Sequence, residues 1–451
     1  MAGTYLAFDD TDSPEGMCTT YLAALMIDHF SDHDLIGLPR LVRLNPNIPW
    51  KTRGNAAICL SLGKGTGRPK ICGSLGDSSV LYYSRGKPSD PSEILPRASR
   101  VLERVAKFDC EKTNPGIVAS NKRPSPSLYW KAVREVIKIG DVESALRRSG
   151  AAWKKYKNGR GVIGAAASMS WRPQDRTWEV IAYRSPKMFG KLRKIEPQSV
   201  IEMDKRTKWT FNNYDYESGH IAIMPGSPCP ILFGIRGDSS SELLRARAMI
   251  RGEAQDKWLL FLTNQGTEDH IVRRSIGTLR IWESGLVRAH VVAPPVVIPG
   301  GHVIVRISDG NEIDAAFYEP SRGFREIAKR LMIGDEVTLM GSVRETPRSL
   351  NVEKMKVENL VDDVRKVRNP YCNKCRKTMG SLGSGHGFRC KKCGARAPYS
   401  LAIFEKFERG ISTGWYEPPV ASRRHLHKPL RRMTKSRWTR HEYVQLNQRV
   451  R

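Results

Sequence analysis

Three aspartates follow a short apolar run near the start of the chain. Residues 4–8 have the length and composition of a buried strand, and Asp9, Asp10 and Asp12 come directly after it. Open α/β sheets bind ligands at the carboxyl ends of their strands, where carboxylates can hold a hard cation against nucleotide phosphates. A helix is expected from Thr19 onward. The alternative is an acidic turn that only caps this helix, since Asp and Ser are common at such positions.

Two further polar segments contain residues suited to phosphate. Residues 45–55 follow a strand candidate and contain two prolines that exclude a helix. Lys51 and Arg53 in this loop are candidates to neutralise a triphosphate or an RNA phosphate. Residues 108–116 form another polar turn with a charge pair. Surface loops often have this composition, so neither segment identifies a site by itself.

Four of the nine cysteines have the spacing of a metal site. Cys372 and Cys375 form one CxxC pair, and Cys390 and Cys393 form a second pair after fourteen intervening residues. Two such pairs close a tetrahedral site of four thiolates, so we predict a structural zinc ribbon. Four thiolates leave no open position on the metal, and the ion therefore holds the fold and does no chemistry. A redox role is disfavoured by the second pair and by the basic surroundings.

The size and charge of the chain narrow its class. It has 451 residues, enough for about three domains, and a net charge of +29. Residues 364–404 contain ten Lys or Arg and no acidic residue, which favours a nucleic-acid partner. The sequence has no run of 18 or more apolar residues and no signal-peptide pattern, so we expect a cytoplasmic protein without membrane association. Nothing in the sequence indicates an obligate protein partner.

Apolar periodicity and turn residues divide the chain into five parts, a multidomain α+β organisation. The expected parts are an α/β unit at 1–155, an α+β unit at 156–272, a β-rich unit at 273–362, the zinc ribbon at 363–398 and a basic helical or extended tail at 399–451. In the first two units the predicted strands are 4–8, 41–44, 56–62, 180–184 and 258–264, and the predicted helices are 98–107, 130–148 and 240–252.

Two regions of the chain differ in composition from their surroundings. Residues 63–97 are rich in Gly, Ser, Pro and Lys and are predicted to be a flexible surface loop. In the β-rich unit, five strands and one inserted helix fit an OB-fold barrel, which binds single-stranded nucleic acid; a generic small β-barrel is the alternative. The predicted strands are 277–281, 287–293, 302–307, 312–317 and 336–342, with a helix at 323–332. The basic tail suits phosphate contacts and base stacking, and a disordered basic tail is the alternative.

Several long motifs together resemble one family, the archaeal tRNA-isoleucine 2-agmatinylcytidine synthetases. The matching segments are DDTDSPEGMCTTYLA at 9–23, LPRLVRLNPNIPWKTRGN at 38–55, EKTNPG at 111–116, GRGVIGA at 159–165, PGSPCPILFGIRG at 225–237 and YEPPVASRRHLHKPL at 416–430. The segments GGHV and AAFYEPSRGFR of the β-rich unit and the zinc ribbon match as well. Residues 63–97 depart from the family, and no role is transferred there.

The resemblance implies a kinase-like domain, a ferredoxin-like domain, an OB-fold and a zinc ribbon. It also implies a reaction, in which the wobble cytidine of an isoleucine tRNA with a CAU anticodon exchanges its C2 oxygen for the amine of agmatine. ATP is cleaved to AMP, and the tRNA then reads AUA. The γ-phosphoryl group first activates the C2 oxygen, a step that requires metal-bridged phosphates and cationic clamps. The implied cofactors are ATP, Mg²⁺ and structural Zn²⁺.

The resemblance and the local chemistry together give sets of candidate residues. The catalytic set is Asp9, Asp10, Asp12, Thr19, Lys51 and Arg53, with Asp9 and Asp12 as Mg²⁺ ligands and Thr19 as the autophosphorylated threonine of the family. The ATP-binding set is Ser13, Thr20, Glu111, Lys112 and Asn114. The agmatine set is Asp204, Trp209, Phe211 and Asp215, of which the aromatic residues suit a core equally well. The tRNA-binding set is Arg423, Arg424, His425, Lys428, Arg431, Arg432, Arg437 and Trp438.

Two other functions compete with this hypothesis. A non-catalytic RNA-binding translation or transcription factor could use a barrel and a zinc ribbon, but it would have no use for the acidic motif at 9–12 or for Thr19. A kinase that acts on a small molecule would leave the basic C-terminal half without a purpose.

Overall fold

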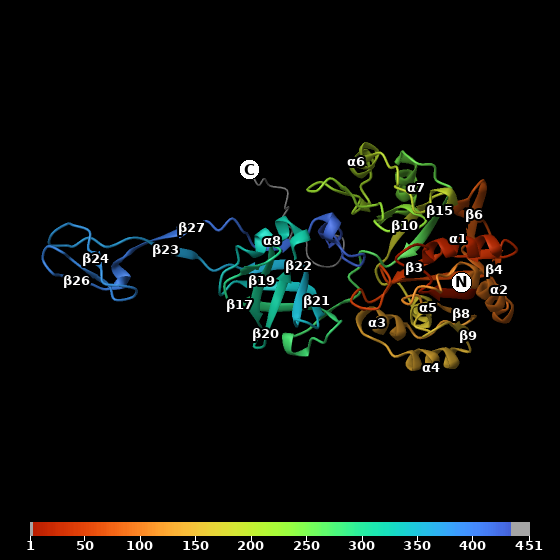
Figure 1. Cartoon of the computed structure of the whole chain (residues 1–451), viewed down its shortest axis with the longest axis horizontal. Coiled ribbons are helices and arrows are strands. Elements are labelled where there is room, and N and C mark those ends of the chain that lie inside the picture. The colour runs from red at the N-terminus through yellow and green to blue at the C-terminus, as the bar shows by residue number, and fades with distance from the viewer. Residues whose placement is uncertain (1–2, 434–451) are drawn as a thin grey trace.

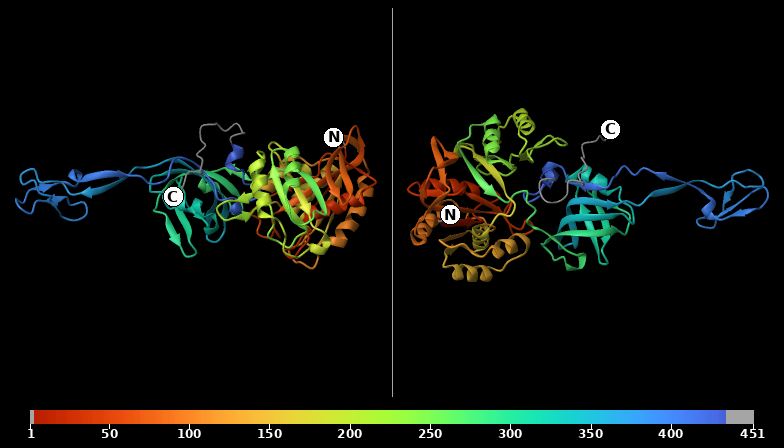
Figure 2. Two further views of the ribbon diagram at one scale, coloured as in Figure 1. Left: turned by 90° about the horizontal axis from the view of Figure 1, so that it is seen from above. Right: turned by 180° about the vertical axis from the view of Figure 1, so that it is seen from behind.

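The structure is a computed structural model that describes residues 3–433. Figure 1 shows an elongated molecule with the N-terminal and second units at one end, a β-barrel in the middle and the zinc ribbon at the far end. The two views of Figure 2 show the same order, with the ribbon held away from the rest by a long two-stranded arm. None of the helices in the described part is long and apolar enough to cross a membrane.

The N-terminal unit combines mostly antiparallel strands with four helices in the described residues. Its elements are β1 (Thr4–Asp9), α1 (Thr19–His29), β2 (Asp34–Ile36), β3 (Arg40–Arg43), β4 (Ala56–Thr66), β5 (Lys70–Leu75), β6 (Ser78–Tyr83), β7 (Arg85–Pro88), α2 (Pro91–Val105), β8 (Gly116–Ser120), α3 (Pro126–Arg134), α4 (Ile139–Ser149) and β9 (Ala152–Lys155). β1 lies between β4 and β8, so its carboxyl end is surrounded by structure on both sides. The strand and helix predicted around the acidic motif are confirmed.

Two predictions for this unit are wrong. Residues 63–97 form no flexible loop, because β4 continues into them, β5, β6 and β7 follow, and α2 begins at Pro91. The apolar side chains of this segment are few, but Cys72 and Val80 are buried because β5 pairs with a strand of the second unit. The single helix predicted at 130–148 is two helices, α3 and α4, because the backbone is extended at Glu135.

The second unit extends the sheet of the first. Its elements are α5 (Gly161–Ser170), β10 (Thr177–Tyr183), α6 (Pro197–Arg206), β11 (Thr210–Phe211), β12 (Tyr214–Asp215), β13 (His220–Ile221), β14 (Ile231–Gly237), α7 (Ser240–Met249) and β15 (Lys257–Thr263). β15 pairs antiparallel with β5 and parallel with β3, which joins both units in one sheet of 13 strands within the described chain. The two units therefore share one continuous sheet.

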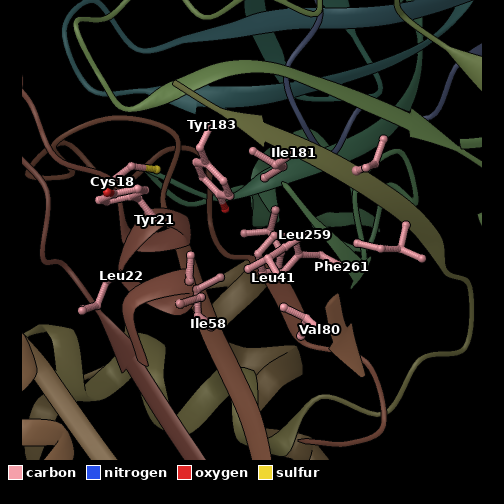
Figure 3. Packing of buried hydrophobic residues seen from close by; sticks show 14 of the residues in the cluster. Cys18, Tyr21, Leu22, Leu41, Ile58, Val80, Ile181, Tyr183, Leu259 and Phe261 are labelled. Atoms are coloured by element: carbon pink, nitrogen blue, oxygen red, sulfur yellow. The ribbon is translucent and has the colours of Figure 1, made fainter. Parts of the chain in front are cut away.

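A shared core holds the two units together. Leu41 and Ile58 from the first unit pack with Ile181 and Phe261 from the second, and Tyr183 reaches α1 (Figure 3). These side chains are 0–2% exposed, and full burial of one such side chain contributes about 1.5–3 kcal/mol. The packing fixes the first turn of α1, and with it the acidic loop, against the second unit.

The β-rich unit is a closed barrel. Its main elements are β17 (Ser284–Val291), β19 (His302–Ser308), β20 (Glu312–Phe317), α8 (Gly323–Ala328), β21 (Glu336–Arg344) and β22 (Ser349–Asn359), with the short strands β16 (Ile271–Arg273) and β18 (Val296–Ile298) at its edge. The pairings β17–β21–β22–β20–β19–β17 complete the ring. Four predicted strands and the helix are confirmed. The strand predicted at 277–281 is wrong, since a 3-10 turn starts there at Ile276 and the fifth strand is β22.

The chain leaves the barrel, forms the ribbon and returns. β23 (Asp363–Arg368) and β27 (Ile403–Phe407) pair as the arm, and β24 (Gly380–Ser381), β25 (Phe388–Arg389) and β26 (Arg396–Ala397) form the small ribbon sheet. β28 (Gly414–Tyr416) then adds to β22 of the barrel. Residues 417–433, here called the C-terminal segment, run on to the first two units and end in the short helix α9 (Leu430–Met433).

Candidate active site

A cavity of about 550 Å³ lies where the first two units and the C-terminal segment meet. It is lined by Asp9, Asp10 and Asp12 from the acidic loop and by Thr19 and Thr20 from the start of α1. Lys51, Thr52 and Arg53 approach from the loop before β4, and Ser227, Cys229 and Arg236 approach from the second unit. All six predicted catalytic residues therefore line one cavity, although they come from separate parts of the chain.

The acidic loop presents one buried carboxylate, that of Asp9, and two half-buried ones. Asp9 ends β1 and is 8% exposed, and its Oδ1 accepts a hydrogen bond from the Asp10 backbone N–H at 2.7 Å. Asp10 has a φ of 57°, an uncommon conformation for a non-glycine residue that is typical of functional sites, and its Oδ2 accepts from the Asn114 backbone N–H at 3.1 Å. Burial and then the neighbouring Asp10 charge raise the pKa of Asp9 well above its usual value. Burial and then the charge of Asp12 raise the pKa of Asp10 to about 7.

This pattern fits a bound cation. Asp9 is buried and Asp10 is half-buried, and the pKa of Asp10 is raised although the nearby Arg160 and Lys157 partly offset its charge. A divalent ion would supply further positive charge to this pair. Among the described residues, the three aspartates do not bring their oxygens within 4.8 Å of one another as a complete ligand cage. A site of one or two carboxylates, completed by phosphate oxygens and water, is what Mg²⁺ commonly uses.

Two glycines of the GRGVIGA motif let α5 lie directly against the acidic loop. A Cβ at Gly164 would be 1.8 Å from Asp9 Oδ2. A Cβ at Gly161 would be 2.3 Å from the Gly116 backbone N and 2.7 Å from the Asp9 backbone O. Any side chain at either position would displace the end of β1. The motif therefore acts by close packing that holds the Asp9 carboxylate in place.

The loop before β4 is fastened to the third aspartate. Asp12 accepts hydrogen bonds from Thr52 Oγ1 at 2.8 Å and from Arg53 Nε at 2.7 Å. Arg53 also donates through Nη1 to Ser227 Oγ at 3.0 Å in the second unit, and it contacts the Met17 backbone O. Asp12 is therefore an ion-pair partner of Arg53 in this structure, which differs from the predicted role as a metal ligand.

Lys51 lies on the same loop. Its ammonium group donates to the Pro46 backbone O. Burial, and then the nearby charge of Arg424, lower its pKa to about 8, so it is still mostly charged at neutral pH. A cation with few local partners at a cavity wall is suited to phosphate.

The first turn of α1 places two hydroxyls at the cavity. Thr19 is the first helical residue and is 6% exposed, and Thr11 Oγ1 donates to its Oγ1 at 3.2 Å. The backbone O of Thr20 accepts from Tyr183 OH at 2.8 Å, which ties the helix start to the second unit. Negative charge near this helix end is favoured by the helix dipole.

The remaining predicted ATP-binding residues do not line the cavity. Ser13 is buried in its own turn, where its Oγ accepts from the Glu15 backbone N–H at 3.2 Å. Glu111 and Lys112 are exposed. Asn114 is buried beneath the acidic loop and supports Asp10 through its backbone. Of the predicted set, only Thr20 lies at the cavity.

The four residues predicted for agmatine are not at the cavity either. Asp204 Oδ1 accepts from Asn213 Nδ2 at 2.8 Å, and Asp215 caps a turn while it accepts from the Ala421 backbone N–H at 2.9 Å. Phe211 is 1% exposed and packs beneath Gly266, and Trp209 is 38% exposed on the outer edge of the sheet. The sequence indicated that these four residues belong to the second unit near its expected interface, but it did not show which face of the sheet they occupy.

The basic C-terminal segment is folded inward. Its cations form ion pairs within the protein: Arg423 with Glu417, Arg424 with Glu353, Lys428 with Asp175, and Arg432 with Asp175 and Asp238. His425 lines the cavity, and Arg431 is exposed. Arg437 and Trp438 lie outside the described residues. Much of the charge that was predicted to contact tRNA therefore holds the barrel, the second unit and the cavity together.

The zinc ribbon is confirmed as a four-cysteine cluster. The Sγ atoms of Cys372, Cys375, Cys390 and Cys393 all lie within 4.8 Å of one another. Backbone N–H groups of Cys393 and Lys392 lower the pKa of Cys390 to about 6, which favours the thiolate that binds metal. Four thiolates at this spacing fit tetrahedral Zn²⁺.

Sequence reasoning missed several cavity residues. Arg43, Glu179 and Arg236 are charged residues within apolar strands, and each lines the cavity. A charged side chain at an inward-facing strand position was a signal that the sequence offered. The ion pair from Arg236 Nε to Glu179 Oε1, at 3.1 Å, could not be seen in it.

The fold and the site define a multidomain α+β protein in which a cavity lined by carboxylates and cations is joined to a β-barrel and a zinc ribbon. Comparison with known proteins agrees. Family models match residues 5–158 (TiaS TCKD domain), 159–270 (TiaS FLD domain) and 369–411 (TiaS C-terminal zinc ribbon domain).

Relatives match over nearly the whole chain. The isoleucine-tRNA 2-agmatinylcytidine synthetase TiaS of Methanocaldococcus jannaschii is 38% identical and covers 95% of this chain and 99% of its own; that of Methanosarcina acetivorans is 40% identical and covers 95% and 97%. The crystal structure of a complex of TiaS with isoleucine tRNA and ATP aligns with a TM-score of 0.82 at 34% identity, over 96% of this chain and 98% of that chain. A complex of TiaS with isoleucine tRNA, AMPCPP and agmatine aligns with a TM-score of 0.80 at 31% identity, with the same coverage. The chain belongs to the TiaS family.

Proposed function

We propose that this protein is an ATP-dependent ligase that joins agmatine to C2 of the wobble cytidine of an isoleucine tRNA with a CAU anticodon. The proposal is supported by the convergence of the acidic loop, the start of α1 and the loop with Lys51 and Arg53 on one cavity, in a chain of the TiaS family. Solved structures of relatives contain isoleucine tRNA, ATP and agmatine with an ATP analogue. The substrates are therefore this tRNA, agmatine and ATP, and we expect the enzyme to act in the cytoplasm.

The chemistry requires an activated oxygen. In the first step the γ-phosphoryl group of ATP is transferred to the C2 oxygen of cytidine, and water cleaves the α–β phosphoanhydride bond, so that the nucleotide is released as AMP and the β-phosphate as free phosphate. In the second, the neutral amine of agmatine attacks C2, a C–N bond forms, and the C–O bond breaks as phosphate leaves with the original oxygen. The protein supplies positioning and charge stabilisation for both steps, with little covalent chemistry of its own.

Residues of the cavity divide these tasks. Asp9 and Asp10 would hold Mg²⁺, which when bound neutralises phosphate charge. Lys51 contacts phosphate, and Asp12 orients Arg53 toward the same ligand. Thr19 is the site of autophosphorylation that the family resemblance implies, in addition to the transfer to cytidine, and its place at the helix start suits the added charge.

The rest of the molecule would hold the tRNA. We assign the kinase-like, ferredoxin-like and OB-fold labels to the first unit, the second unit and the barrel. The ribbon carries exposed cations such as Lys374, Lys391 and Lys392 on a long arm, which suits contact with tRNA phosphates at a distance from the cavity. The anticodon base must be splayed out of its loop to enter the cavity.

A direct assay tests the function. The full chain is incubated with ATP, agmatine and a tRNA transcript with a CAU anticodon, and the mass of the wobble nucleoside is measured. We expect a mass increase that requires all three substrates and that Asp9→Asn abolishes. No mass change with a well-folded protein would refute the proposal. A non-catalytic RNA-binding factor is not favoured, because the relatives are synthetases and the carboxylates of the acidic loop would serve no purpose in it.

A further inference from the structure

Four side chains of the cavity have no part in the mechanism described above. They are Arg43 from β3, Glu179 from β10, Arg236 from β14 and His425 from the C-terminal segment, and together they are called the polar wall. The backbone O of His425 accepts from the Gly266 N–H at 2.8 Å, which holds this residue against the second unit. The polar wall thus joins three parts of the chain that are far apart in sequence.

Two glycines let side chains of the polar wall pack directly against the backbone. A Cβ at Gly54 would lie 2.6 Å from Arg43 Nη1 and 3.0 Å from His425 Nε2, so these two side chains converge on one point. A Cβ at Gly234 would lie 2.8 Å from Glu179 Oε1. Both glycines line the cavity. The two glycines therefore fix the guanidinium, the imidazole and the carboxylate against the backbone at the wall of the cavity.

The polar wall has unused hydrogen-bonding capacity. Within the described residues, Arg43 Nε and His425 Nδ1 are buried and have no hydrogen-bond partner. Burial and then the charge of Arg43 lower the pKa of His425 well below its usual value, so its ring is neutral and can both donate and accept. Glu179 contacts Arg236 and Gln265, and its carboxylate oxygens can accept further hydrogen bonds. Unsatisfied buried polar groups are costly and mark a place for a ligand.

The chemistry of the polar wall selects among the three substrates. The cationic groups of agmatine would be repelled by Arg43 and Arg236. A phosphate would meet the carboxylate of Glu179. A neutral base that offers acceptors beside an amino group satisfies both kinds of residue, and the Watson–Crick edge of cytosine has this pattern.

We propose that the polar wall reads the target cytosine, an inference that rests on the proposed function. Glu179 accepts a hydrogen bond from the N4 amino group, while Arg43 and His425 donate toward N3. Uracil has a carbonyl in place of the amino group and an N–H at N3, so each contact would become a repulsion. Enzymes that act on a flipped base commonly recognise it by this edge.

A double-mutant-type cycle, in which both the wobble base of the tRNA and residue 179 of the enzyme are varied, tests the role of Glu179. We compare kcat/KM for tRNA with cytidine at the wobble position and for tRNA with 2-pyrimidinone ribonucleoside there, which lacks only the amino group. The wild type should prefer cytidine by about tenfold or more, as expected for a hydrogen bond to a charged group. Glu179→Gln should reduce that preference to about twofold. Any effect of the missing amino group on the intrinsic reactivity of the base cancels, because both enzymes use both tRNAs.

The outcomes separate the explanations. If Glu179→Gln lowers activity on both tRNAs equally, Glu179 is a structural residue and the inference is wrong. If the preference is kept and direct titration shows weaker ATP binding, the polar wall is a phosphate subsite, which also overturns it. Glu103→Gln, an exposed change on α2, is the matched control and should keep the wild-type preference. Failure of the wild type to modify the cytidine tRNA would instead count against the proposed function.

His425 has an independent test. His425→Asn keeps a polar atom near the position of Nδ1, whereas His425→Leu removes it and retains bulk. We expect the Leu variant to lose about tenfold in kcat/KM for tRNA, with ATP binding unchanged, and the Asn variant to recover most of the loss. Equal activity of the two variants, with equal melting temperatures, would show that Nδ1 of His425 makes no hydrogen bond to the base.

Discussion

Gly164→Ala tests whether the place of Asp9 is set by the packing of α5. The added Cβ would lie 1.8 Å from Asp9 Oδ2, whereas ordinary contact begins at 3.4 Å. The carboxylate or the helix must therefore move by about 1.6 Å, and a misplacement of about 1 Å at a catalytic group can cost about 100-fold in rate. We expect kcat for tRNA modification to fall about 100-fold.

The stability of this variant is expected to change little. Alanine in place of glycine within a helix stabilises by about 1 kcal/mol, whereas a clash in a packed interior costs about 1–3 kcal/mol. The net loss of about 0–2 kcal/mol leaves a folded protein that a thermal melt can confirm.

Gly140→Ala is the matched control, because Gly140 lies in α4 and a Cβ there meets nothing within 4 Å. This variant should gain up to about 1 kcal/mol of stability and keep wild-type activity. Activity is measured from initial rates of nucleoside modification under saturating ATP and agmatine. If Gly164→Ala keeps the wild-type kcat while Gly140→Ala behaves as expected, the position of Asp9 is not what the reaction needs, and the reasoning fails.

Three further predictions concern the zinc ribbon and the C-terminal segment. Cys390→Ser should abolish bound zinc, measured by atomic absorption, and weaken tRNA binding while ATP binding stays unchanged; retained zinc would contradict the four-thiolate site. Arg432→Met removes a buried guanidinium that pairs with Asp175 and Asp238 and should cost about 1.5–3 kcal/mol by chemical denaturation, against less than about 0.5 kcal/mol for Arg148→Met, an exposed change on α4, so equal costs would refute the anchoring role. Burial raises the pKa of Glu417, but the charge of Arg423 outweighs burial and brings this pKa to about 2, below its usual 4.5. The contribution of Glu417 to stability is therefore present above pH 4.5 and is lost as pH falls toward 2. The free energy of local opening of residues 417–433 should therefore fall by on the order of 3 kcal/mol over this range, and their amide hydrogen exchange should become faster. If the Glu417→Gln variant shows the same pH dependence as the wild type, the assignment to Glu417 is wrong.

Local patterns were sufficient for part of the fold. β1, the start of α1, most barrel strands and the cysteine cluster follow from apolar runs, turn residues and fixed ligand spacing, which are properties of neighbouring residues. The segment 63–97 was missed because its strands carry few apolar side chains and are stabilised by pairing with β4, β2 and β15. The basic C-terminal segment was misjudged for a similar reason, since its counter-charges Asp175, Asp238 and Glu353 are distant in sequence.

The sequence by itself determined the acidic motif, the cationic loop, the zinc ligands and the family, because each is carried by residue types at short spacing. Only the tertiary structure decided which charges meet. It paired Asp12 with Arg53, placed Asp9 against Gly164, moved the predicted agmatine residues away from the cavity and brought His425 beside Arg43. The physical reason is that sheet pairing between the two units and the return of the chain from the ribbon set these contacts, and neither is encoded in a local pattern.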